Sequence, residues 1–145
     1  MDQTRWTMDR AEELMEGFEA RTLPRERWTH QAHLVVAFLY LSRLSPDDAL
    51  VRLRSGITAY NASVGTANTD TSGYHETITR LYVAGVAEHI GLHGHLAAAE
   101  QLNALLASPM GASDWPLRFY TRDRLFSVEA RRQWIEPDRS GAPQA

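Results

Sequence analysis

An uninterrupted apolar stretch from Leu34 to Leu41 constrains the fold of this chain more than any other feature of its sequence. Thr29 precedes it at a suitable position for a helix N-cap, so the pattern predicts a helix over about 30–43. A helix that is apolar on every side is typical of a buried position. We therefore expect other parts of the chain to enclose this helix.

Helical patterns recur along the rest of the chain, and no segment has the pattern of a convincing strand. Asp9 and Glu12 have the spacing of a capping box, and Ser45-Pro46 combines a hydroxyl cap with a proline in the first turn. The patterns predict helices over about 10–20, 30–43, 46–61, 74–90 and 96–107, with a short one over 128–134. The sequence thus predicts an all-α fold, a bundle of four to five helices with an irregular C-terminal arm.

The length and charge of the chain limit the classes of protein to consider. Its 145 residues suit a single helical domain, 1–145, with an ordered core over about 9–138 and a disordered tail over 139–145. The net charge of −3 gives no indication of a nucleic-acid partner, and no segment approaches the ~20 apolar residues of a membrane span. The N-terminal residues lack the apolar core of a signal peptide, so we expect a cytoplasmic protein. The sequence leaves its oligomeric state open.

Two residue types are missing altogether, which narrows the chemistry further. The chain has no cysteine, so no thiolate can act as a nucleophile or a metal ligand. It also has no lysine, which excludes a Schiff base with substrate or with pyridoxal phosphate. The remaining candidates are histidine, carboxylate, hydroxyl and arginine side chains, or a metal ion held by nitrogen and oxygen.

Two histidines, His30 and His33, begin the apolar helix, and their spacing of three residues places both on one face. A buried imidazole needs partners for its ring nitrogens, because an unpaired polar group costs a few kcal/mol. The pair therefore predicts a polar site within the core. His75 is the natural third member, since it begins another helix that is predicted to face the core.

Histidine nitrogens suit zinc or iron, and a carboxylate beside them leaves a coordination position for water or substrate. We therefore predict a metal-dependent enzyme in which a divalent metal ion, zinc or iron, is held by His30, His33 and His75. Glu76 would act as a ligand or general base, and Tyr74 would contact a small-molecule substrate. We expect these side chains to converge in one pocket, closed partly by the polar loop over 62–73.

Two other interpretations use the same residues without a metal. In the first, the three histidines act as acid and base, because imidazole titrates near neutral pH. Tyr74 and the loop hydroxyls of Thr69, Thr71 and Ser72 would then orient the substrate. In the second, the protein is a ligand-binding or interaction protein, and its buried histidines are structural. Glu76 would then pair with Arg80 on the helix surface.

The C-terminal arm carries basic residues among aromatic ones: Arg118, Arg122, Arg124, Arg131 and Arg132. Such a cluster can clamp a carboxylate or a phosphate group. Arginines of this kind also pack over aromatic side chains and pair with nearby carboxylates. We favour packing here.

Three strings of the sequence carry a resemblance to a known family. They are WTHQAHL at 28–34, TSGYHETITR at 71–80, and LFS, EARR, W and EPD within 125–138. Over roughly 28–138, the chain resembles a family of small, largely uncharacterised helical proteins of bacteria. The resemblance implies no reaction, but it marks four motif positions: His30, His33, His75 and Glu76.

Overall fold

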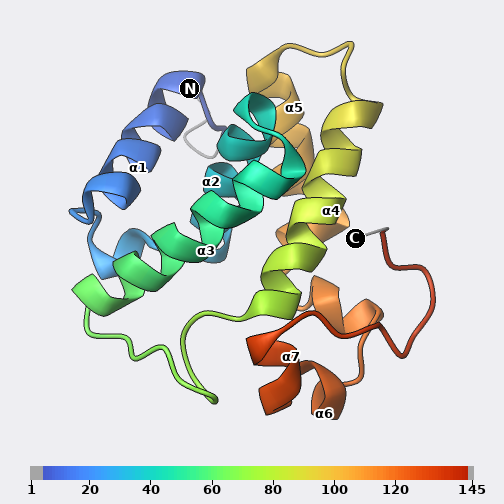
Figure 1. The fold of residues 1–145 in the computed structure, drawn as a ribbon. Helices are drawn as coiled ribbons and strands as arrows, with labels where there is room; N and C mark the ends of the chain where they lie inside the picture. Colours follow the sequence, from blue (N-terminus) through green and yellow to red (C-terminus); the bar gives the residue numbers. More distant parts are fainter. Residues whose placement is uncertain (1–4, 144–145) are drawn as a thin grey trace.

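Helix α2 (His30–Arg43) lies at the centre of the fold, and four other helices contact it (Figure 1). These are α1 (Met8–Ala20), α3 (Pro46–Ser63), α4 (Glu76–Leu92) and α5 (Ala98–Ala107). Every side chain from Leu34 to Tyr40 is buried, which confirms the prediction of an enclosed apolar helix. The Thr29 hydroxyl accepts a hydrogen bond from the Ala32 N–H at 3.2 Å, so Thr29 is the N-cap, as predicted.

The computed structural model describes residues 5–143, and these contain only helices, turns and irregular segments, with no strand. After α5 come two short helices, α6 (Arg122–Leu125) and α7 (Val128–Arg132). Single 3₁₀ turns occupy Arg25–Arg27, Pro109–Gly111 and Trp115–Arg118. The all-α prediction is therefore confirmed. Within this described part of the chain, no helix is long and apolar enough to cross a membrane.

Three helices begin differently from the prediction, and one of them, α5, starts at Ala98 and not at about 96. Thr7, and not the expected capping box at Asp9 and Glu12, caps α1, because its hydroxyl accepts from the Arg10 N–H at 3.1 Å. Asp9 lies in the first turn, where a carboxylate complements the helix dipole. Helix α4 begins at Glu76, because His75 has an extended backbone and serves as the N-cap.

The C-terminal arm, residues 108–143, is folded against the start of α4 (Figure 1). The buried Thr77 hydroxyl donates to the Gln133 carbonyl at 2.8 Å and accepts from the Ile135 N–H at 3.2 Å. The Tyr120 hydroxyl, also buried, donates to the Ile135 carbonyl at 2.6 Å. Within the predicted disordered tail, the Arg139 N–H donates to the Phe119 carbonyl at 2.8 Å. The last two residues of that tail, 144 and 145, lie outside the described residues.

Gly85 lets this arm approach the middle of α4. A Cβ atom at this position would lie 2.8 Å from both Met110 Sδ and Trp115 Cη2, which is shorter than a van der Waals contact. Glycine inside a helix costs about 1 kcal/mol relative to alanine. The close packing of Met110 and Trp115 against the helix offsets that cost.

Candidate functional site

A cavity of about 400 Å³ lies beside the two histidines that begin α2. Helices α2, α3 and α4 form three of its walls, and the C-terminal arm forms the fourth. Its apolar lining is Leu34, Ala37, Leu53, Ile57, Ile78, Pro116, Leu117, Leu125 and Phe126. The polar side chains in its wall are His30, His33, Thr79, Tyr82 and Ser113. We call it the histidine cavity.

His30 is held by the arm that closes the cavity. Its Nε2 lies 2.8 Å from the Met110 carbonyl oxygen. A carbonyl only accepts, so Nε2 carries the proton and donates it. The other ring nitrogen, Nδ1, has no hydrogen-bond partner within residues 5–143.

His33 is held by its own helix. Its Nδ1 donates to the Thr29 carbonyl at 2.7 Å, and its ring lies 3.9 Å from the Trp28 ring, centroid to centroid. Burial lowers the pKa of His33 to about 4, against the opposing effect of the Thr29 hydrogen bond. His33 is therefore neutral at pH 7. Its Nε2 can accept a hydrogen bond, and no partner for it occurs among residues 5–143.

Tyr82 is a cavity residue that the sequence-based site prediction missed. Its hydroxyl is buried and has no hydrogen-bond partner in the described part of the chain. Burial raises the pKa of Tyr82, so the phenol stays protonated at neutral pH and can donate. Its position was predictable, because Tyr82 follows His75 and Ile78 at helical steps of three and four residues.

The prediction that loop 62–73 helps to close the pocket is wrong. The cavity is closed by the arm, and Phe126 stands at its rim with half of its surface exposed. Asn68 holds the loop against α3, because its amide donates to the Thr58 carbonyl at 3.0 Å. The same side chain accepts from the Tyr74 N–H, also at 3.0 Å.

His75, unlike the other two histidines, does not line the cavity. Its Nδ1 accepts from the Ile78 N–H at 3.1 Å, and its Nε2 donates to the Leu125 carbonyl at 2.6 Å. Both ring nitrogens are thus occupied. Burial lowers the pKa of His75, which favours this neutral ring. His75 links the start of α4 to the arm.

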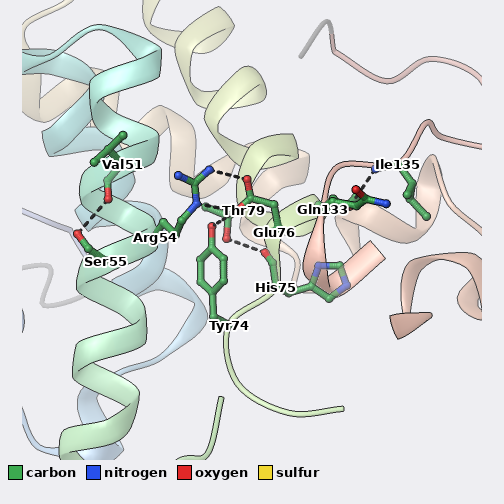
Figure 2. A network of polar contacts seen from close by, with 10 residues as sticks. Val51, Arg54, Ser55, Tyr74, His75, Glu76, Thr79, Gln133 and Ile135 are labelled. Atoms are coloured by element: carbon green, nitrogen blue, oxygen red, sulfur yellow. Dashed lines mark hydrogen bonds and ion pairs between the residues drawn. The ribbon is translucent and has the colours of Figure 1, made fainter. Parts of the chain in front are cut away.

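Glu76 lies in a network of polar contacts between α4 and α3 (Figure 2). Arg54 donates to both carboxylate oxygens, from Nε at 3.0 Å and from Nη2 at 2.7 Å, and the Tyr74 hydroxyl donates at 2.7 Å. Burial alone would raise the pKa of Glu76, but the hydrogen bonds from Arg54 and Tyr74 outweigh it and lower the pKa. Figure 2 shows the His75 ring pointing away from this carboxylate.

This arrangement does not fit the roles predicted for Glu76 and Tyr74. An efficient general base has a pKa near the working pH, whereas the pKa of Glu76 is lowered. Glu76 is instead 7% exposed, ionised and held by three donors. The Tyr74 hydroxyl is committed to that carboxylate. The predicted surface pair with Arg80 is also replaced, because the partner is Arg54 on another helix.

The residues present do not fit the predicted three-histidine metal site either. His75 has no lone pair left, so only His30 and His33 could supply ligands, and two imidazoles do not complete a zinc or iron site. Within residues 5–143, no group of three or more histidine, aspartate or glutamate side chains is arranged to hold a metal ion. A bound metal stays a prediction from the sequence.

Comparisons with protein-family models, with curated proteins and with solved structures find no match. The resemblance to the bacterial family stays a prediction. The cavity and its side chains are therefore the features from which a function can be inferred.

Proposed function

We propose that the histidine cavity binds a small, largely apolar molecule that carries a hydroxyl group. One observation carries the proposal: an apolar cavity of about 400 Å³ has two imidazoles in its wall, each with one ring nitrogen unused among residues 5–143. Cavities of this size, with apolar walls and a few polar groups, are typical of small-molecule sites. The apolar side chains supply affinity, and the polar groups orient the ligand.

Three polar groups suit one end of such a ligand. The neutral His33 presents an acceptor at Nε2, because its Nδ1 donates to a carbonyl, and His30 presents its unpaired Nδ1. Tyr82 lines the same cavity, and its unpaired hydroxyl, which neighbouring protein atoms cover, would supply a donor once a ligand displaces that cover. A ligand hydroxyl both donates and accepts, so it matches an imidazole acceptor and a phenol donor together.

Binding fits these residues better than acid–base catalysis does. An efficient general base has a pKa close to the working pH. The pKa of His33, at about 4, makes it a weak base at neutral pH and a good hydrogen-bond acceptor. We therefore favour a ligand-binding protein over the metal-free enzyme.

The polar part of the proposal is tested with two probes that share one apolar body, 2-naphthol and naphthalene. His33→Leu removes the acceptor while keeping an apolar side chain. One lost hydrogen bond is worth about 1 kcal/mol, so this change should weaken 2-naphthol binding about fivefold to tenfold. Naphthalene binding should change less than about twofold. Titration by tryptophan fluorescence measures both affinities, and equal effects on the two probes, or no binding of either, would contradict the proposal.

The contribution of the apolar lining is tested with a residue at the rim of the histidine cavity. Phe126 is 50% exposed and lines the cavity, whereas Val128 is 42% exposed and does not. Phe126→Ala should weaken the binding of both probes severalfold with little effect on thermal stability. Val128→Ala is the matched control and should leave both affinities unchanged. Equal losses from the two variants would show that the exposed apolar surface, and not the cavity, holds the probes.

A further inference from the structure

A second hollow, of about 570 Å³, lies between α3, the loop that precedes α4, and α7. Four arginines line it, on three different elements: Arg54, Arg80, Arg131 and Arg132. Two carboxylates, Asp70 and Glu76, lie among them. We call it the arginine cleft. It shares no lining residue with the histidine cavity and plays no part in the function proposed above.

Two of the four guanidinium groups are neutralised within the cleft. Arg54 donates through two nitrogens to Glu76, as described above. Arg132 holds Asp70 in the same two-pronged way, with Nε 2.7 Å from Oδ1 and Nη2 2.6 Å from Oδ2. Both carboxylates are therefore used, and two positive charges remain.

The remaining charges belong to Arg80 and Arg131, which form no direct ion pair in the part of the chain described; Arg80 acts on Glu76 only through space, where it helps to lower the pKa of that carboxyl. Arg131 donates from Nη1 to the Gly73 carbonyl at 2.9 Å, but its Nε is buried and unpaired within residues 5–143. Arg80 lies over the Trp134 ring, with its guanidinium carbon 5.8 Å from the ring centroid. A partly buried guanidinium without an acceptor for each donor is unfavourable, and a bound anion removes that cost.

We propose that the arginine cleft binds the phosphate group of a small molecule between Arg80 and Arg131. A phosphate monoester carries nearly two negative charges at pH 7, which matches the two unbalanced guanidinium groups. A carboxylate would neutralise only one of them. The guanidinium fork suits phosphate oxygens, and the rings of Trp134 and Tyr74 in the cleft wall offer a face for a planar organic group.

The test compares phenyl phosphate with inorganic phosphate, which lacks the ring, and with benzoate, which carries a carboxylate in place of the phosphate, all titrated at constant ionic strength. Phenyl phosphate should bind saturably and more tightly than either inorganic phosphate or benzoate. Arg80→Gln should weaken it at least about tenfold, because one charge-assisted contact is lost. Arg122→Gln removes the same charge from an exposed position on α6 and should change the affinity less than about twofold.

A second variant tests the role of Arg131, whose Nε is unpaired within residues 5–143. Arg131→Lys keeps the positive charge but removes Nε and the two-pronged geometry, so it should weaken phenyl phosphate severalfold while thermal unfolding confirms a folded protein. Absence of saturable binding, or equal weakening by Arg80→Gln and Arg122→Gln, would overturn the proposal. Benzoate that binds as tightly as phenyl phosphate would also overturn it, in favour of a carboxylate site. Binding of 2-naphthol in the histidine cavity should be unaffected by Arg80→Gln.

Discussion

The carboxylate of Glu76 illustrates how long-range contacts decide the role of a single residue. At helical spacing, its expected partner is Arg80, one turn along α4. In the structure, Arg54 and Tyr74 hold it instead, and Arg54 comes from α3. Arg80 is thereby left to line the arginine cleft. The carboxylate that suggested catalysis in the sequence therefore joins α4 to α3 in the structure.

Removing the charge of Glu76 should destabilise the protein. In Glu76→Gln, the two-pronged ion pair between the buried carboxylate and the half-exposed Arg54 becomes a weaker contact, so we expect a loss of about 1–2 kcal/mol in the free energy of unfolding. Glu16→Gln changes an exposed carboxylate on α1 and should cost less than about 0.5 kcal/mol. Urea unfolding measures both. Equal stabilities of the two variants would show that the network contributes nothing.

His33 makes stability depend on pH. Burial lowers its folded pKa to about 4, from about 6.5 in the unfolded chain, so the unfolded state binds more protons between these values. The contribution is fully present above pH 6.5 and is lost as the pH falls toward 4, by up to about 3 kcal/mol. The lowered pKa of His75 acts in the same direction.

Unfolding in urea at pH 7.5 and at pH 4.5 tests this dependence. His33→Gln should lose about 2 kcal/mol less than the wild type between the two pH values, because it lacks the titrating ring. A drop of the same size in both proteins would assign the acid sensitivity to other groups.

At the scale of elements, local patterns predicted the helices and the burial of α2, because caps and apolar periodicity are local signals. The Thr29 cap and the Ser45 cap are confirmed by hydrogen bonds to Ala32 and Asp48. The start of α4 was predicted differently, because histidine is not a usual cap residue. His75 takes that role since Leu125, 50 residues further along the chain, fixes its other nitrogen. No local pattern contains that information.

Gly85 and Gly91 form a matched pair of helix glycines on α4. Alanine favours a helix by up to about 1 kcal/mol over glycine, and nothing lies near a Cβ at Gly91. Gly91→Ala should therefore stabilise the protein by about 0.5 kcal/mol. Gly85→Ala would place its methyl group 2.8 Å from Met110 and Trp115 and should destabilise it by about 1–3 kcal/mol. Thermal unfolding of the two variants should give shifts of opposite sign, and two stabilising shifts would contradict the close packing of the arm.

At the scale of the whole molecule, the candidate site depends on the C-terminal arm. The sequence identified His30 and His33, and both line the cavity. It assigned the closing segment to loop 62–73, because a long polar loop often has a functional role. The arm closes the cavity instead, through contacts such as Met110 with His30 that join residues 80 positions apart. Pairings at such separations depend on the complete fold.

The central claim, that the cavity beside His30 and His33 holds a ligand, is tested most directly by filling it. Ala37 is buried in α2 and lines the cavity, so Ala37→Leu adds three carbons to the space that the ligand would occupy. Titration calorimetry with 2-naphthol should show binding to the wild type and a loss of at least about tenfold in the variant, while thermal stability is kept or raised. Equal affinity of 2-naphthol for a folded Ala37→Leu protein and for the wild type would contradict the claim.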